Sequence, residues 1–409
     1  MIFYRHVAKP HNLKESTPKR LAIGMLKIDR IDTFIVDLPT IRPHVLAMST
    51  MHRQSLVIVR IHGSDGHVGI GEGTTIGGLS YGDESPESIK LAIDTYIAPV
   101  LLGCDPVRPA AAMQQVARSV VGNHFAKCAV ETALFDAQGK RLGVSVSELL
   151  GGRLRDRLPV LWTLASGVTT TDIAEAEEML DRKRHNAFKI KIGKRSIAED
   201  VAHVSAIKRA IGDSASIRVD VNQAWSEADA RGGIAALADV GVDLVEQPVA
   251  RHNRVGMARL AARAAIPIMA DEALRGPEDA VDIVARGAAD IFAVKIAQSG
   301  GLLAAQRVAA IGAAGGMALY GGTMLEGGIG TIASAQVFAT FPRLEWGTEL
   351  FGPLLLTEEI LAAPLTYADF ELQVPDGPGL GIALDDDRTA FFTRDAARRT
   401  ISIPTEERA

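Results

Sequence analysis

Three carboxylates end three consecutive apolar runs in the middle of the chain, and their types and spacing suit the binding of a metal ion. They are Asp220, Glu246 and Asp271. If the runs are neighbouring parallel strands, these ends meet at one mouth, where three anions repel strongly unless a positive charge lies among them. Oxygen ligands of this kind suit a hard dication, Mg²⁺ or Mn²⁺. The alternative is that each carboxylate pairs with a Lys or Arg at the rim.

Lysines flank the three carboxylates on both sides. Lys189 and Lys191 are two residues apart in an alternating run, so both point to the same face of one predicted strand. Lys295 ends a later run. An ammonium group that points into the protein is costly to bury, and a metal with neighbouring ammonium groups depresses the pKa of a lysine, which allows proton exchange near neutral pH. The alternative is a pair of salt-bridged lysines that span the interior.

Together these residues suit proton transfer at the carbon α to a carboxylate. That proton is weakly acidic because the enolate formed on its loss carries extra negative charge on the carboxylate oxygens. A divalent metal at those oxygens stabilises the charge, and a lysine exchanges the proton. The sequence contains no convincing Ser-His-Asp or Cys-His set.

The rhythm of the chain from about residue 158 predicts the elements that hold these groups. Short apolar runs, each ending in a polar or charged residue and followed by an amphipathic stretch, recur every 24 to 29 residues. Successive βα units produce this pattern, and eight of them predict a closed (β/α) barrel with its active site at the carboxyl ends of the strands. A doubly wound open sheet is the structural alternative. The eight predicted strands are 160–163, 188–191, 217–220, 243–246, 266–271, 291–295, 317–320 and 344–349.

An α+β unit precedes the predicted barrel. Two strands around a Gly-Ser-Asp-Gly turn at 63–66 predict a hairpin, and helical spacing predicts three helices after it. The strands are 55–61 and 67–71, and the helices are 84–102, 109–120 and 126–142. We therefore divide the chain into a poorly ordered extension, an N-terminal α+β domain, a (β/α) barrel and a C-terminal segment, at 1–24, 25–152, 153–360 and 361–409.

Composition and charge exclude several other classes of protein. Of 409 residues, 47% are hydrophobic and 23% are charged, the balance of an ordinary globular protein. The net charge of −5 argues against nucleic acid as a partner, and no apolar run is long enough to span a membrane. With only Cys104 and Cys128, we expect no disulfide framework and a reducing, cytoplasmic location. His185 follows three basic residues, where we expect a solvated helix end.

The same residues, with their neighbours, resemble the muconate cycloisomerase (muconate lactonizing enzyme) family of the enolase superfamily. The resemblance rests on Lys189-Ile-Lys191, Asp220-Val-Asn-Gln-Ala-Trp, Glu246-Gln-Pro, Asp271-Glu272 and Lys295. A mandelate-racemase-like member would carry a histidine at position 295. Further stretches typical of this branch extend the resemblance over about 25–385, and they lie at 38–44, 74–81, 162–167, 320–326 and 349–357.

The resemblance implies a modified TIM barrel of the enolase type, capped by the N-terminal domain with the C-terminal segment returning to it. It also implies the reversible conversion of cis,cis-muconate to muconolactone in catechol catabolism. Lys191 would exchange the proton, Lys189 would support it electrostatically, and Lys295 would stabilise charge on the opposite side of the substrate. Glu326 matches the acidic residue assigned as a proton donor in this family.

The remaining implications of the resemblance concern the cofactor, the lid and the assembly. The three carboxylates would hold Mn²⁺ or Mg²⁺. Segments 42–54 and 74–81 would close over a small dicarboxylate substrate and exclude water. The family also implies a homo-oligomer, an octamer, with neither nucleic acid nor membrane as a partner.

Three related activities and one inactive role remain open. Chloromuconate cycloisomerases share the chemistry, although 76–79 and 325–328 look more like the non-chlorinated branch. Succinylbenzoate synthases and dipeptide epimerases share the lysines and ligands, but 345–349 lacks the Asp-x-Asp with which dipeptide epimerases bind an ammonium group. A catalytically silent metal-binding protein would lack a lysine or a ligand, whereas all six positions are present here.

Overall fold

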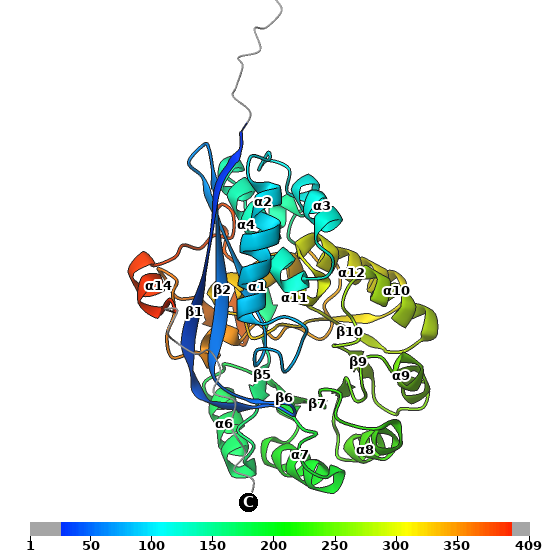
Figure 1. Cartoon of the computed structure of the whole chain (residues 1–409). Helices are drawn as coiled ribbons and strands as arrows, with labels where there is room; N and C mark the ends of the chain where they lie inside the picture. The colour runs from blue at the N-terminus through cyan, green and yellow to red at the C-terminus, as the bar shows by residue number, and fades with distance from the viewer. Residues whose placement is uncertain (1–25, 395–409) are drawn as a thin grey trace, which may run out of the picture.

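An antiparallel sheet with its helices and a curved parallel sheet with its own helices make up the two halves of the chain (Figure 1). They are described by a computed structural model over residues 26–394. The predicted extension at 1–24 and the end of the predicted C-terminal segment lie outside these described residues. Within 26–394, no helix is both long and apolar enough to cross a membrane.

The predicted N-terminal hairpin is confirmed. Strands β1 (Ile28–Val45), β2 (Thr50–Gly63) and β3 (Val68–Thr74) form an antiparallel sheet in chain order. Gly66, whose φ is 83°, supplies the left-handed residue of the turn between β2 and β3. The end of β1 reaches the second half of the chain, where the Val45 N–H donates to the carbonyl oxygen of Ala165 at 2.9 Å.

The three predicted helices follow this sheet. The first continues through a short π-helical stretch in place of a single α-helix. The last, α4, packs so closely on β3 that a Cβ at Gly71 would lie 1.9 Å from the carbonyl oxygen of Ala129, so this contact requires glycine. The elements are α1 (Pro86–Ala92), η1 (Ile93–Ile97), α2 (Ala98–Leu101), α3 (Pro109–Ser119), α4 (His124–Leu142) and α5 (Val146–Leu149).

Seven parallel strands in chain order form the curved sheet of the second half, and helices cover its outer side (Figure 1). The strands are β5 (Trp162–Leu164), β6 (Ala187–Lys191), β7 (Ser216–Asp220), β8 (Leu244–Glu246), β9 (Ile268–Ala270), β10 (Ile291–Val294) and β11 (Ala318–Gly321). The helices are α6 (Thr169–Asp181), α7 (Ile197–Ile211), α8 (Glu227–Asp239), α9 (Arg254–Ala261), α10 (Pro277–Arg286), α11 (Ile296–Ser299), α12 (Leu302–Ala314) and α13 (Gly328–Phe338).

Local sequence sets the ends of the barrel helices. Ser196 and Glu199 form a capping box at the start of α7, where the Ser196 hydroxyl accepts the Glu199 N–H and the Glu199 carboxylate accepts the Ser196 N–H. Ser226 caps α8 in a similar way. Gly287 ends α10 with a φ of 59°, a left-handed conformation that favours glycine. These residues fix where the helices begin and end, so that the chain turns back toward the next strand.

The eighth predicted strand, 344–349, is not a strand in the structure. Thr348 instead makes isolated parallel bridges to Val160 and Gly321, and so links the start of the β5 segment to β11. Gly347, directly before it, has a φ of 63°, which turns the chain out of the extended conformation. The parallel sheet therefore has seven strands, and single-residue bridges close the gap between its two edges.

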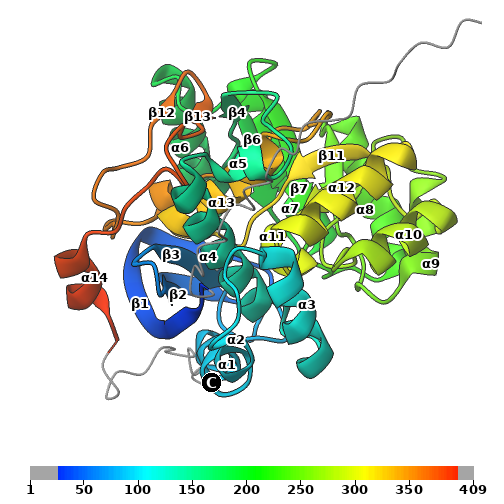
Figure 2. The same cartoon turned by 90° about the horizontal axis from the view of Figure 1, so that it is seen from above.

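The end of the described chain packs against the N-terminal half. Helix α14 (Asp386–Phe392) lies beside β1 (Figure 2), and the Arg394 guanidinium bonds the carboxylate of Asp37 at 2.7 Å. Between α13 and α14 lie η2 (Gly352–Leu355), β12 (Tyr367–Ala368) and β13 (Glu371–Gln373). The two strands form a small antiparallel sheet with β4 (Arg157–Pro159), which precedes β5 in the chain.

The expectation of a solvated His185 is wrong. Only 1% of this residue is exposed. Its ring stacks on Trp162 with the centroids 5.2 Å apart, and its Nδ1 lies 2.9 Å from the carbonyl oxygen of Val160. The turn after α6 therefore brings this side chain against the β5 segment instead of into solvent.

Candidate active site

The carboxyl ends of adjacent barrel strands bring the predicted lysines and carboxylates together. The register pairs Lys191 with Asp220 across β6 and β7, and Asp220 with Glu246 across β7 and β8. Asp271 directly follows β9 and Lys295 directly follows β10. Strand ends that are in register therefore convert a spacing along the sequence into one cluster in space.

The three predicted metal ligands form the centre of this cluster. Asp220, Glu246 and Asp271 are each 1% exposed, and one oxygen from each lies within 4.8 Å of the others. Burial and the charges of Asp220 and Asp271 raise the pKa of Glu246 well above its usual value. The Glu246 Oε1 atom has no hydrogen-bond partner. Three buried oxygen donors with an unsatisfied atom among them fit a hard divalent cation.

Lys189 and Lys191 both point from β6 into the barrel, as predicted, but they have different partners. The Nζ of Lys191 lies 2.5 Å from Asp220 Oδ2 and 3.2 Å from Asn222 Oδ1. The Nζ of Lys189 lies 2.9 Å from both Glu246 and Glu349. Burial alone would lower the pKa of Lys189, but these two carboxylates raise it well above its usual value. Lys189 is therefore a fixed positive charge.

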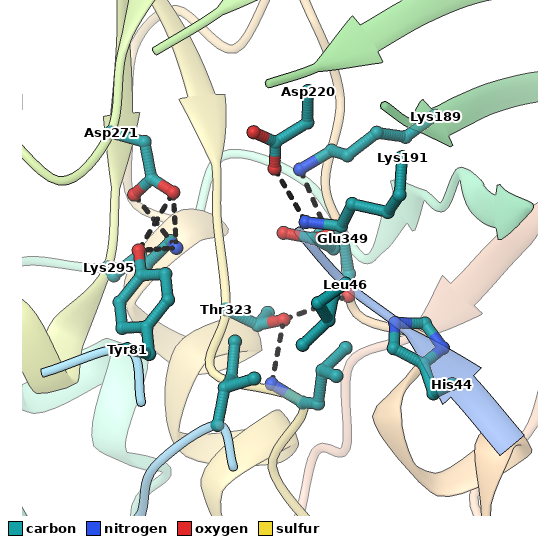
Figure 3. Close-up of a pocket in the computed structure, with 12 residues that line it drawn as sticks. His44, Leu46, Tyr81, Lys189, Lys191, Asp220, Asp271, Lys295, Thr323 and Glu349 are labelled. Carbon is teal, nitrogen blue, oxygen red and sulfur yellow. Dashed lines mark hydrogen bonds and ion pairs between the residues drawn. The ribbon is translucent and has the colours of Figure 1, made fainter. Parts of the chain in front are cut away.

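Lys295 occupies the other side of the cluster, across from Lys191 (Figure 3). Its Nζ lies 2.8 Å from Asp271 and 2.8 Å from the hydroxyl oxygen of Tyr81. The Tyr81 hydroxyl in turn donates to Asp271 at 2.8 Å. Burial opposes the charge on Lys295, yet Asp271 and Glu349 raise the pKa of this lysine above its usual value. Cationic groups thus stand on both sides of the carboxylates.

Segments of the N-terminal half cover this cluster and enclose a cavity. The tip of β1 and the loop after β3 contribute to its lining. Side chains from both halves of the chain therefore close over the strand ends. The lining residues are His44, Leu46, Ile76, Tyr81, Lys189, Lys191, Asp220, Asp271, Lys295, Thr323, Leu325 and Glu349.

Glu326, predicted as a proton donor, is buried but does not line this cavity. One of its oxygens accepts the Met324 N–H at 2.9 Å, and the other has no hydrogen-bond partner. Burial and the nearby Glu72 raise the pKa of Glu326 to about 8. Its carboxyl group therefore holds a proton at neutral pH, and it is not one of the groups that line the cavity.

Sequence reasoning gave no role to several residues that the structure places in the cavity. Glu349 had a signal, since it ends the last predicted run, and it lines the cavity beside Lys189. His44 and Tyr81 lie in segments 42–54 and 74–81, which the resemblance placed over the substrate, but neither residue was given a role of its own. They come from the N-terminal half, and only the packing of the two halves brings them to the barrel mouth.

Comparisons with known proteins agree with this arrangement. Residues 30–151 match the family model for the mandelate racemase / muconate lactonizing enzyme N-terminal domain, and 171–388 match the enolase C-terminal domain-like model. Muconate cycloisomerase 1-1 of Acinetobacter lwoffii is 60% identical over 373 residues, which are 91% of this chain and 98% of that protein. The chain belongs to the muconate cycloisomerase family. The family resemblance seen in the sequence is thereby confirmed.

Two further members place the chain within this family. A solved structure of muconate lactonizing enzyme from Pseudomonas fluorescens, complexed with muconolactone, matches with a TM-score of 0.90 and 59% identity, covering 90% of this chain and all 100% of that one. A chloromuconate cycloisomerase from Cupriavidus pinatubonensis is 46% identical and covers 90% of this chain and 100% of its own. This chain is thus more similar to the non-chlorinated members, as the sequence predicted.

Proposed function

We propose that this protein catalyses the reversible lactonisation of cis,cis-muconate to muconolactone. The observation that carries the proposal is the placement of Lys191 and Lys295 on opposite sides of the buried Asp220 and Asp271 (Figure 3). This arrangement provides a proton carrier on one side and a fixed positive charge on the other. The similarity to muconate cycloisomerases, at 60% identity, gives the substrate.

The reaction needs no nucleophile from the protein. One substrate carboxylate adds to the alkene carbon β to the other carboxylate, and a carbon–oxygen bond forms. The electrons of the alkene move toward the second carboxylate, and the carbon α to it takes up one proton. The muconate dianion plus a proton thus gives the muconolactone anion, and the reverse reaction removes the same proton.

Lys191 moves the proton in this proposal. Its side chain is 9% exposed, and its ammonium group is held at the cavity wall by Asp220 and Asn222. These contacts aim Nζ at a substrate in the cavity and keep the lysine in one orientation, which general acid–base catalysis requires. Lys189, clamped between Glu246 and Glu349, supports it as a fixed charge.

Asp220, Glu246 and Asp271 would hold the divalent ion. When bound, Mn²⁺ or Mg²⁺ supplies stabilisation of the negative charge that develops on the substrate carboxylate. Lys295 adds positive charge from the opposite side, where Tyr81 and Asp271 fix its position. The enclosed cavity excludes water, so these charges act in a medium of low dielectric constant.

We extend the proposal to the assembly and location of the protein. The family resemblance supports a homo-oligomer. Light scattering is expected to give a multiple of the single-chain mass, and an octamer is the family's expectation. Cys104 and Cys128 are free thiols, which suits the cytoplasm.

An ultraviolet assay tests the proposed reaction. Purified protein with Mn²⁺ is expected to remove the absorbance of the conjugated diene of cis,cis-muconate, and proton NMR should identify muconolactone as the product. EDTA should stop the reaction, and excess Mn²⁺ should restore it. No loss of diene with folded, metal-loaded protein would exclude muconate as the substrate, and succinylbenzoate-type and dipeptide substrates would be tested next. Comparison of the rates with muconate and chloromuconate in the same assay shows which of the two substrates this protein prefers.

A further inference from the structure

His44 is a buried side chain whose hydrogen-bonding capacity is not used by the protein. It is 0% exposed, and neither Nδ1 nor Nε2 has a hydrogen-bond partner. It also lines the cavity. Among the cavity-lining side chains of residues 26–394, it is the one that has unpartnered buried polar atoms. Such a group is costly unless something else satisfies it.

The tip of β1 is anchored on both sides of His44. The Arg42 guanidinium forms an ion pair with Glu175 on α6 at 2.8 Å, and the Val45 N–H donates to the carbonyl oxygen of Ala165 at 2.9 Å. These contacts attach the strand to the barrel just before and just after the histidine. The imidazole therefore has a fixed position in the cavity wall.

The imidazole is neutral and so offers one N–H donor. Burial, with the nearby charges of Lys191, Arg42 and Lys189, holds the pKa of His44 well below its usual value. Figure 3 shows His44 on the side of the cavity that carries Lys191, across from Lys295 and Asp271. A ligand that extends from the carboxylate cluster toward β1 meets this ring.

We propose that His44 donates a hydrogen bond to the carboxylate of muconate that attacks the alkene. The inference rests on the proposed function, since it requires a dicarboxylate with one end at the metal-ligand cluster. The other end then needs a donor. Lys189 and Lys295 are each held by two or more protein groups, whereas His44 is free to donate. One carboxylate oxygen accepts the bond, and the other is left oriented toward the alkene.

The proposed role of His44 affects only one of two steps, proton exchange and ring opening, that start from the same intermediate. Starting from muconolactone, Lys191 removes the proton α to the carboxylate, and the resulting carbanion either regains a proton from the solvent pool or opens the lactone ring. Opening breaks the carbon–oxygen bond and regenerates the carboxylate that His44 binds. Proton exchange leaves the lactone ring closed. A loss of the His44 donor therefore affects opening and spares exchange.

Two substitutions test the inference. His44→Phe keeps a flat ring and removes both nitrogens, and His44→Gln keeps an N–H donor. For His44→Phe we expect kcat/KM for muconate to fall by about tenfold or more, since a hydrogen bond to a charged group is lost. With muconolactone in D₂O, the ratio of deuterium incorporation to ring opening should rise by a similar factor. His44→Gln should recover part of both losses.

His67→Phe is the matched control, because this histidine lies at the turn between β2 and β3, outside segments 42–54 and 74–81, and its side chain is 42% exposed. It should leave both measurements unchanged. If exchange and opening fall together in His44→Phe, or if neither changes, the inference is wrong. If the wild-type protein does not act on muconate at all, the proposed function fails and the inference fails with it. Circular dichroism of each variant distinguishes either result from unfolding.

Discussion

Lys191 and Asp220 are register partners on adjacent parallel strands, and their side chains meet with Nζ 2.5 Å from Oδ2. This pair joins the proposed proton carrier directly to a proposed metal ligand. Both groups are almost completely buried, so a change of charge on one strongly affects the other. The proposed function therefore predicts that metal binding and proton transfer are coupled at this pair.

The first prediction concerns Lys191. Lys191→Met keeps the length of the side chain and removes the proton carrier, so kcat for muconate should fall by about 10²- to 10⁴-fold. The fall should appear equally in deuterium incorporation into muconolactone, because both need the same proton transfer. Lys194→Met, an exposed neighbour, should retain wild-type activity. Full activity in Lys191→Met would assign the proton to another group.

The second prediction concerns metal binding. The three carboxylates come together only in the folded protein, so Mn²⁺ should raise the melting temperature of the wild type by binding the native state. Glu246→Gln removes one anionic ligand and one partner of Lys189, and it should weaken Mn²⁺ binding by about tenfold or more in calorimetry. Glu177→Gln, an exposed change on α6, should bind Mn²⁺ as the wild type does. Equal affinity in Glu246→Gln would remove this residue from the ligand set.

The central cluster could be predicted from the sequence because the position of each of its residues depends only on its own strand and on the next strand in the chain. A charge at the end of a short apolar run lies at the end of a strand, and parallel strands in chain order place such ends next to one another. Asp220, Glu246 and Asp271 follow this logic, and so does Lys191. The Gly-Ser-Asp-Gly turn at 63–66 added a further local signal for the hairpin.

The rest of the site depends on packing between distant segments. His44 lies on β1, far in the sequence from the lysine at 191 that it approaches, and no periodic pattern predicts that pair. The prediction of an eighth strand was wrong for a different reason. Gly347 has a left-handed conformation, so this segment makes only isolated bridges, at Thr348. Glu326 was chosen by resemblance alone, whereas the geometry places Glu349 in the cavity.

The third prediction concerns pH and the contact between the two halves. Glu131 on α4 accepts the Leu303 N–H at 3.2 Å in the first turn of α12. Burial raises the pKa of Glu131 from its ordinary 4.5 to about 7. The folded protein therefore holds this proton more tightly than the unfolded chain does. The associated stability is present below about pH 4.5 and is lost as the pH rises through about 7, an effect of about 3 kcal/mol.

Urea unfolding at several pH values measures this effect. Glu131→Gln has no titrating group but keeps an oxygen for the Leu303 N–H, so its free energy of unfolding should fall less than that of the wild type between about pH 5 and 8. Glu148→Gln, on the neighbouring helix α5, serves as the control and should follow the wild type. Parallel curves for the wild type and Glu131→Gln would show that Glu131 titrates alike in both states.

The last prediction compares two buried glutamates. Glu349 lines the cavity and lies 2.9 Å from Lys189, whereas Glu326 does not line the cavity. We expect Glu349→Gln to lower kcat/KM by about tenfold or more, because Lys189 loses a charged partner and the field in the cavity changes. Glu326→Gln should lower it less. The opposite order would support the proton-donor role that the resemblance gives to Glu326. In that case the pKa of about 8 predicts that activity falls above pH 8, as this carboxyl loses its proton, and that Glu326→Gln abolishes this dependence.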